Sequence, residues 1–160
     1  MKRHIGMLAI VTMVAACSGG GNSAVQQAPQ QGGFALQSQS AGGEAQVTLH
    51  ASPAAGAIVT LIGQLDYDPA RLTMTNCRIG AGAAAGKMLH FKEAAPGVIR
   101  AVVEGGLQTL PPDADVLTCT FAAAPGAARG PATVRAQGKV ADMSLKDRSF
   151  AAQATVEIGK

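Results

Sequence analysis

From Glu44 onward, the chain consists of short segments that alternate apolar and polar residues, separated by clusters of glycine and proline. In residues 57–67, for example, Leu61 and Tyr67 fall in one phase, and Thr60, Gln64 and Asp66 fall in the other. The segments with this period are residues 46–51, 57–67, 87–91, 98–103, 116–123, 132–139 and 152–158. A period of two is typical of strands with one buried face, so the sequence predicts an all-β fold, an antiparallel β-sandwich of jelly-roll type with about eight to nine strands. Residues 80–86, rich in alanine and glycine, fit either a loop or one helical turn.

The first seventeen residues have a different pattern. Lys2 and Arg3 precede an apolar stretch over residues 5–14, which is too short to span a bilayer and is typical of a secretory signal. The stretch ends in Val-Ala-Ala-Cys, which resembles the lipobox of bacterial lipoproteins. We therefore expect residues 1–16 to be a lipoprotein signal peptide and Cys17 to be lipidated. The alternative is an ordinary cleaved signal peptide followed by an incidental cysteine.

This N-terminal pattern also predicts where the protein resides. A lipidated Cys17 would anchor the chain to a membrane, outside the cytoplasm. Ser18 occupies the position at which an aspartate is associated with inner-membrane retention in enteric bacteria. We therefore expect a lipid-anchored protein of the cell envelope, at the outer membrane.

Residues 17–43 are rich in glycine, serine, glutamine and alanine, and they show no apolar period. Such a composition buries too little apolar surface to offset the entropy lost on ordering, so it predicts a flexible tether. The folded domain is then expected over residues 44–160. Phe34-Ala35-Leu36 forms a small apolar island within the tether, and it either docks on the domain or has no structural role.

Charge and aromatic content narrow the possible partners. Removal of Lys2 and Arg3 with the signal leaves 11 basic side chains, against 10 acidic ones in the whole chain. The mature chain is thus nearly neutral and has no basic run, so we expect no nucleic-acid partner. The chain has no tryptophan, and its single tyrosine is Tyr67. This composition disfavours polysaccharide binding through exposed aromatic rings.

Two cysteines remain after Cys17. Cys77 and Cys119 form an even pair in an exported chain, and Cys119 shares its phase with apolar neighbours, so we predict a disulfide between them. A bridge over about 40 residues stabilises by about 4 kcal/mol in the chain-entropy model. The alternative is two free buried thiols. His50 and His90 are isolated in the sequence, so we expect neither a metal site nor a cofactor.

The segment Leu65-Asp66-Tyr67-Asp68-Pro69-Ala70-Arg71-Leu72 follows the pattern L-x-Y-D-P-x-x-L, in which a strand ends on Tyr-Asp and a proline turns the chain. This pattern resembles a signature of the cohesin-like and carbohydrate-binding-module-like sandwich superfamily. Further matches follow in order at residues 77–80, 96–103, 115–121 and Gly130. The resemblance covers residues 44–158, and it implies a cohesin-like sandwich that serves as a binding module.

No catalytic motif accompanies this resemblance. The sequence contains no nucleophile elbow, zinc-binding helix or phosphate loop, so we expect that the protein is not an enzyme. Asp68 is expected to cap the turn after its strand. The paired carboxylates Asp113 and Asp115 are interpreted as a solvated loop, with a calcium site as the less favoured alternative.

Two functional classes therefore remain. The first is a protein–protein interaction module that binds an envelope or secreted protein, and the second is a lipoprotein that binds carbohydrate or an envelope polymer. The candidate binding residues are Arg100 and Arg135, the latter in a polar row with Thr133 and Gln137, because arginine is enriched in interface hot spots. The alternative is that these are ordinary solvated strand faces.

Overall fold

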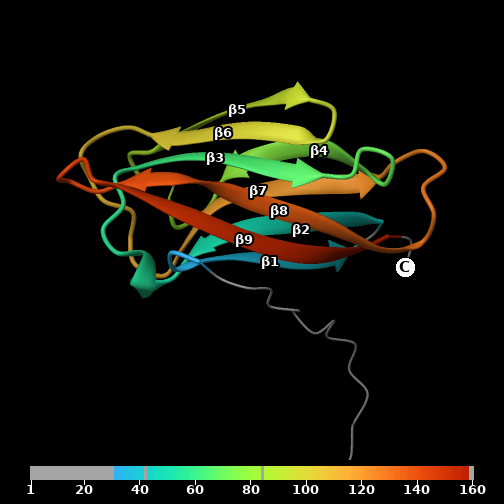
Figure 1. The fold of residues 1–160 in the computed structure, drawn as a ribbon, viewed down its shortest axis with the longest axis horizontal. Helices are drawn as coiled ribbons and strands as arrows, with labels where there is room; N and C mark the ends of the chain where they lie inside the picture. Colours follow the sequence, from blue (N-terminus) through green and yellow to red (C-terminus); the bar gives the residue numbers. More distant parts are fainter. Residues whose placement is uncertain (1–30, 42, 84, 159–160) are drawn as a thin grey trace, which may run out of the picture.

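The computed structural model describes residues 31–41, 43–83 and 85–158. The expected signal peptide, Cys17 and the first part of the expected tether lie outside these residues. Nine strands and one short 3-10 helix, η1, make up the fold (Figure 1). In chain order they are β1 (Phe34–Ala41), β2 (Glu44–Ala51), η1 (Pro53–Ala55), β3 (Thr60–Tyr67), β4 (Leu72–Ile79), β5 (Met88–Ala95), β6 (Val98–Glu104), β7 (Ala114–Ala123), β8 (Gly130–Ala141) and β9 (Asp147–Ile158). No helix in the described ranges is long and apolar enough to cross a membrane.

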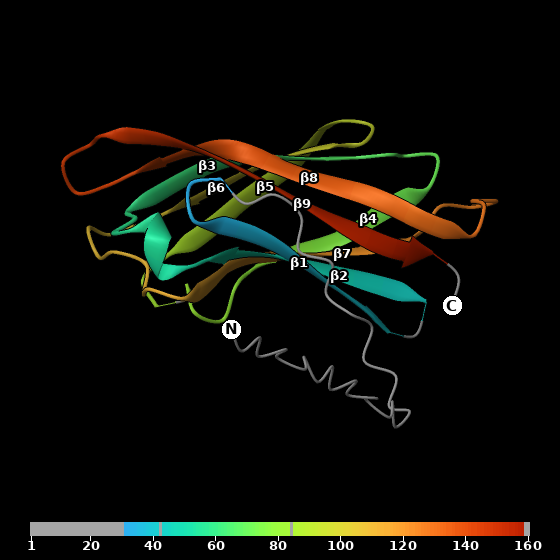
Figure 2. The ribbon, with the colours of Figure 1, turned by 60° about the horizontal axis from the view of Figure 1, so that its bottom comes forward.

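The strands form two antiparallel sheets that pack face to face (Figures 1 and 2). One sheet has the order β1-β2-β7-β4, and the other has the order β5-β6-β3-β8-β9. The sheets meet along β1 and β9, where the Ser38 hydroxyl donates to the Thr155 carbonyl at 2.7 Å. The predicted all-β antiparallel sandwich with eight to nine strands is therefore confirmed.

The core lies between the two sheets and follows the predicted alternation. Leu61, Leu65 and Tyr67 of β3 are buried, as are Val134 of β8 and Val156 of β9. The alternate residues of these strands, such as Ile62 and Gln64 of β3 and Arg135 of β8, face outward and are partly or fully exposed. Each strand thus buries one face, and the hydrophobic effect fixes the register of the sandwich.

The predicted boundary of the tether at residue 43 is wrong. Phe34–Ala41 forms β1, which pairs with β2 along its whole length. Phe34 and Leu36 are 0% and 2% exposed, and the Phe34 ring centroid lies 4.6 Å from that of Phe150. The apolar island therefore docks on the domain, because β2 supplies backbone partners and the core supplies the burial that the local composition lacks.

Like β1, the strand β4 lies outside the segments that the sequence predicted to be strands. Its inward positions include Met74, Cys77 and Ile79, but a register shift between Met74 and Asn76 breaks the period of two. After β4, Ala83 N–H donates to the Gly80 carbonyl at 3.0 Å, and Gly80 N–H donates to the Val116 carbonyl at 2.9 Å. In the described part of residues 80–86, the chain therefore forms a turn rather than a helix.

The disulfide prediction is confirmed. Cys77 and Cys119 are register partners on β4 and β7, and their sulfur atoms are bonded at 1.97 Å. Both side chains are buried in the core. The bond ties the edge strand β4 to the centre of its sheet.

A glycine pair in the other sheet makes room for an aromatic ring. Gly63 of β3 and Gly138 of β8 are register partners, and both lie at inward positions of their strands. A Cβ added to Gly138 would lie 2.8 Å from Phe150 Cε1 and would collide with the Ile62 carbonyl. The Phe150 ring therefore occupies space that a side chain would need, and it connects this sheet to Phe34 of β1.

Candidate functional site

The outer surface of the five-stranded sheet is the most continuous candidate for a binding surface, and we call it the five-strand face. Its side chains alternate with buried ones such as Ile99, Ala101 and Val103 of β6. Strand registers place them in rows across the sheet. On four of the strands the outward residues include Met88, His90 and Lys92 of β5, Arg100, Val102 and Glu104 of β6, Thr60, Ile62, Gln64 and Asp66 of β3, and Thr133, Arg135, Gln137 and Lys139 of β8.

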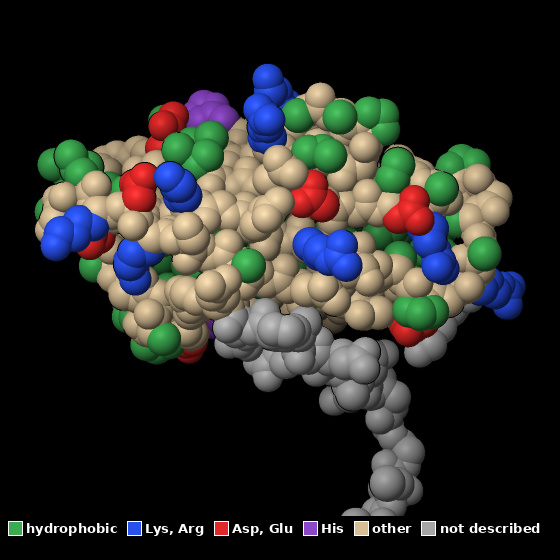
Figure 3. Space-filling model, viewed as in Figure 1, with side chains coloured by type: hydrophobic (Ala, Val, Ile, Leu, Met, Phe, Trp, Pro, Cys, Tyr) green, Lys and Arg blue, Asp and Glu red, His purple; other side chains and the backbone are tan. Residues whose placement is uncertain are grey.

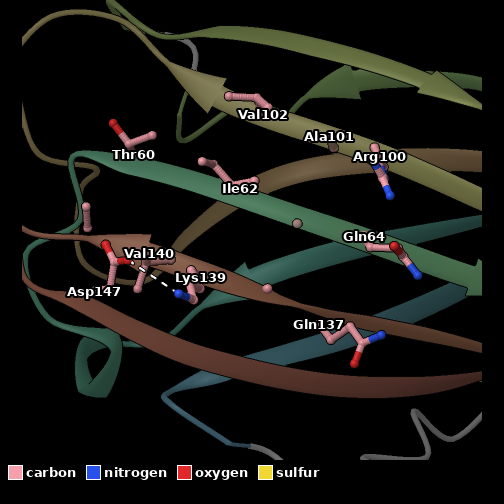
Figure 4. Close-up of a pocket in the computed structure, with 13 residues that line it drawn as sticks. Thr60, Ile62, Gln64, Arg100, Ala101, Val102, Gln137, Lys139, Val140 and Asp147 are labelled. Carbon is pink, nitrogen blue, oxygen red and sulfur yellow. Dashed lines mark ion pairs between the residues drawn. The ribbon is translucent and has the colours of Figure 1, made fainter. Parts of the chain in front are cut away.

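A shallow depression of about 500 Å³ occupies the middle of this face (Figure 4). Ile62 and Val102 are register partners at its centre, and Ile62 is 59% exposed. Beside them lies a polar row in which Gln64 is opposite Arg100 on one side and Gln137 on the other. The depression therefore combines exposed Ile62 and half-buried Val102 with side chains that can donate and accept hydrogen bonds.

Charged groups surround this apolar pair, and both signs are present over the face (Figure 3). Asp66 accepts hydrogen bonds from Gln64 Nε2 at 2.6 Å and from Gln137 Nε2 at 3.3 Å. The carboxylate of Asp147 lies 3.6 Å from Lys139 Nζ. These carboxylates thus already have partners within the protein.

Some of the cations on the face are free. Among the described residues, Lys92 and Arg100 form no ion pair or side-chain hydrogen bond, and both are exposed. Arg135 donates from Nε to Gln153 Oε1 at 3.2 Å, which leaves its terminal nitrogens available. Lys92, Arg100 and Arg135 therefore offer a partner three cations that form no ion pair within the described part of the chain.

The structure brings the two candidate binding residues to the same face. Arg100 lies opposite Gln64, and Arg135 lies opposite Asp66, two residues further along β3. Thr133 and Gln137 lie on this face as well. Cys77 and Cys119 lie in the core, and Cys17 is outside the described residues.

Sequence reasoning missed the apolar centre of the site. Ile62 directly follows Leu61, so it falls in the outward phase of a strand whose inward phase is already apolar. Val102 directly precedes the inward residue Val103, so it too falls in the outward phase of its strand. An apolar residue out of phase was therefore the signal that could have revealed this centre.

The Tyr-Asp-Pro motif forms a strand end. The Asp68 carboxylate accepts a hydrogen bond from Ala70 N–H at 2.9 Å, which confirms that Asp68 caps the turn. The Tyr67 hydroxyl donates to Glu93 Oε1 at 2.7 Å. Burial, together with this neighbouring carboxylate, raises the pKa of Tyr67 to about 12.

His50 belongs to a cluster that the sequence did not suggest. Its Nδ1 lies 3.0 Å from Asp115 Oδ1, and its Nε2 lies 3.1 Å from Asp113 Oδ1. The hydrogen bond to Asp115, assisted by Asp113, raises the pKa of His50 against the opposing effect of burial. A neutral imidazole has one N–H and cannot donate to both carboxylates, so the geometry favours the imidazolium. The interpretation of Asp113 and Asp115 as a purely solvated loop is therefore wrong.

This cluster is an internal link rather than a metal centre. The register of β2 and β7 places His50 opposite Asp115, although 65 positions separate them in the sequence. Asp113, with a φ of 61°, lies in the loop that crosses from one sheet to the other. In the ranges that the structure describes, no group of three His, Cys, Asp or Glu side chains is arranged to hold a metal ion.

Lys87 forms a second internal link, at the start of β5. Its ammonium donates to the carbonyls of Val59 at 2.8 Å, Gly105 at 2.6 Å and Gly106 at 3.2 Å. The side chain is buried, and this desolvation lowers the pKa of Lys87. All three ammonium protons are used in holding the neighbouring loops, so Lys87 has a structural role.

Comparison with known proteins identifies the architecture. No protein-family model and no curated protein matches this sequence. Among solved structures, the cohesin module of a family 33 glycoside hydrolase from Clostridium perfringens superposes with a TM-score of 0.65 at 11% identity, over 79% of this chain and 96% of that one. The chain has a cohesin-like fold.

Two further structures support this assignment. A non-cellulosomal cohesin from Archaeoglobus fulgidus gives a TM-score of 0.61 at 13% identity, covering 79% of this chain and 90% of its own. A type I cohesin–dockerin complex from Clostridium thermocellum gives 0.60 at 16% identity, covering 79% and 99%. At these identities the likeness concerns the cohesin-like sandwich itself, so the chemistry of the site must be argued from the residues of this chain.

Proposed function

We propose that this protein is a lipid-anchored envelope protein whose cohesin-like sandwich binds another protein through the five-strand face. The observation that carries the proposal is the apolar pair of exposed Ile62 and half-buried Val102, bordered by the free cations Lys92 and Arg100 on a cohesin-like fold. Solved structures with this fold include type I cohesin–dockerin complexes. The module acts by binding, with no catalytic step.

The chemistry of the face suggests how a partner is held. An apolar side chain of the partner would cover Ile62 and Val102 and exclude water from them. Carboxylates of the partner would pair with Arg100, whose planar guanidinium makes two parallel hydrogen bonds, and with Arg135. Because the carboxylates of Asp66 and Asp147 already have partners in this chain, they compete little for these cations.

Binding of a polysaccharide or other envelope polymer has less support. Sugar recognition usually relies on exposed aromatic rings, but the chain has no tryptophan and the ring of its single tyrosine, Tyr67, is buried. The five-strand face therefore fits a protein surface better.

The anchor is proposed from the sequence. Cys17 follows a signal-like stretch, and lipidation there would hold the domain at the envelope, with Ser18 favouring the outer membrane. Replacement by Cys17→Ser is expected to release the protein from the membrane fraction or to leave the signal uncleaved. Unchanged membrane association and unchanged mass would contradict the anchor.

Photocrosslinking in cells tests the face. A photoreactive phenylalanine analogue at position 62 is expected to form adducts with a partner protein that mass spectrometry identifies. The matched control places the same analogue at position 39, because Gln39 is exposed on β1 of the other sheet. Adducts at position 39 but not at 62 would show that the other sheet is the binding surface.

Measured affinities complete this test. With the identified partner purified, Arg100→Ala and Arg135→Ala are expected to weaken binding by about tenfold or more, as for hot-spot arginines. Arg129→Ala is the control, since Arg129 is exposed outside the five-strand face. Full affinity in both test variants would contradict the assignment.

A further inference from the structure

Exposed apolar side chains gather at one end of the sandwich. The described residues include six exposed large apolar side chains. Ile62 lies at the centre of the five-strand face, and Phe91 lies further along β5. The other four are Met88, Leu107, Met143 and Leu145, which are 58%, 78%, 60% and 83% exposed. Met88 also lies at the edge of the five-strand face. All four lie where β3, β5, β7 and β9 begin and β6 and β8 end, and we call this the loop end.

Two loops at this end lie on either side of one short segment. Leu110 N–H donates to the Ile58 carbonyl at 2.7 Å, and Val59 N–H donates to the Ala141 carbonyl at 2.8 Å. The loop that carries Leu107 and the β8–β9 hairpin that carries Met143 and Leu145 are therefore neighbours. Figure 1 shows both at the left end of the molecule.

The hairpin holds its apolar side chains in place without burying them. The Asp142 carboxylate accepts hydrogen bonds from the N–H groups of Ser144 at 2.8 Å and Lys146 at 3.2 Å. Leu145 has a φ of 56°, in the left-handed region that leucine rarely adopts. Neither local conformation nor core packing accounts for a leucine at this position, so an external contact would explain it.

The neighbouring loop is held as well. Lys87 donates to the carbonyls of Gly105 and Gly106, directly before Leu107. Leu107 nevertheless remains 78% exposed. The loop end thus presents several apolar side chains from loops that hydrogen bonds fix.

Charge at the hairpin suits a lipid surface. The Asp142 carboxylate is engaged in the turn, and Asp147 lies beside Lys139, whereas the exposed Lys146 forms no ion pair among the described residues. Apolar side chains next to a free cation match the boundary between acyl chains and anionic headgroups.

We propose that the loop end contacts the membrane, with Leu107, Met143 and Leu145 entering the headgroup–acyl boundary. This inference rests on the proposed anchor at Cys17. Gln31 lies fourteen positions after Cys17, and a fully extended chain of that length spans at most about 50 Å. Gln31 N–H donates to the Ala151 carbonyl near the start of β9, so the anchored domain would remain within reach of the bilayer.

The absence of tryptophan makes this proposal easy to test. The chain from residue 17 onward is coupled through its Cys17 thiol to a maleimide lipid in phosphatidylethanolamine–phosphatidylglycerol vesicles. Cys77 and Cys119 are protected by their disulfide. The test variant is Leu145→Trp, and the matched control is Ala128→Trp, on the exposed loop between β7 and β8 at the opposite end.

On the vesicles, the tryptophan of Leu145→Trp is expected to show blue-shifted emission and strong quenching by brominated lipids. The tryptophan of Ala128→Trp is expected to show neither effect. Coupling is chemical, so the result does not depend on lipidation in cells and is independent of the Cys17→Ser test. Equal, unshifted emission from both reporters would overturn the proposal. If the emission of Leu145→Trp does not change on vesicles but shifts when a purified partner protein is added, the loop end contacts a protein, and the membrane proposal is overturned.

A second experiment measures vesicle co-sedimentation of the chain that is not coupled to the maleimide lipid. Leu107→Ser, Met143→Ser and Leu145→Ser together are expected to lower vesicle co-sedimentation by about tenfold or more, because apolar burial is lost. The melting temperature should stay nearly unchanged, since these side chains are exposed. Unchanged co-sedimentation would contradict the membrane contact.

Discussion

At the scale of single residues, the ionic link between His50, Asp113 and Asp115 is the feature with the clearest physical consequence. It joins β2 to the loop before β7 through both ring nitrogens of one imidazole. The link needs a protonated ring, so its strength depends on pH. The loop between the two sheets is therefore held most firmly under acidic conditions.

This link predicts a pH-dependent contribution to the free energy of unfolding. The pKa of His50 is raised in the folded state, so its stabilisation is fully present below the unfolded value of 6.5 and is lost as pH rises through the folded pKa. His50→Asn is expected to cost on the order of 1 kcal/mol at pH 5.5 and much less at pH 8.5. Urea unfolding of both proteins at the two pH values measures this difference.

His90 provides a control for this prediction. His90 lies 3.5 Å from Glu104, and both side chains are largely exposed. Exposed ion pairs contribute little, so His90→Asn should leave stability nearly unchanged at both pH values. A larger cost for His50→Asn at pH 8.5 than at pH 5.5 would show that the link is not ionic.

At the scale of elements, β1 changes the definition of the domain. Its first residues provide core side chains, whereas Gln39 and Ala41 near its end are exposed. The ring of Phe34 packs on Phe150, which in turn lies over the Gly63–Gly138 pair. Residues 34–41 are therefore part of the folded unit, as a strand of one sheet that packs against β9 of the other.

Truncation of the Phe34 side chain tests this role. Phe34→Ala is expected to lower the free energy of unfolding by about 3–5 kcal/mol, because it leaves a cavity beside Phe150. Gln39→Ala on the same strand is the control and should be nearly neutral. Chemical unfolding of the two variants measures this difference. If Phe34→Ala leaves the free energy of unfolding unchanged, β1 does not contribute to the stability of the domain.

At the scale of the whole molecule, the fold separates three regions. The five-strand face and the loop end share Met88 and otherwise consist of different residues, so a partner and a membrane could be contacted together. The core between the sheets is crossed by no charged pair among the described side chains, and the Cys77–Cys119 bond lies within the opposite sheet. Binding and stability thus depend on separate sets of residues.

The disulfide is expected to stabilise the whole domain. It closes a loop with a sequence separation of 42 residues, so its removal should cost about 4 kcal/mol in the chain-entropy model. The variant with both cysteines replaced by alanine should melt at a lower temperature than the oxidised protein. The oxidised protein should lose a similar amount when reductant is added, and equal stability in all three forms would contradict this role.

The sequence by itself was enough to predict the class of fold. Alternation in segments such as residues 57–67 and 132–139 depends on local periodicity, which the strand geometry translates directly into buried and exposed faces. The parity of the cysteines after Cys17 was likewise enough to predict the disulfide. The arginines Arg100 and Arg135 were predicted separately, as two residues on different strands.

Only the tertiary structure decided which distant residues meet. β1 is stable because it pairs with β2 and buries Phe34 and Leu36 in the core, whereas the apolar island Phe34-Ala35-Leu36 alone left open whether this segment docks. Register across β3 placed Arg100 and Arg135 on one face around Ile62, and register between β2 and β7 placed His50 between two carboxylates. Local pattern determines which way a side chain points, but strand order and register determine its neighbours, and those depend on the packing of the whole chain.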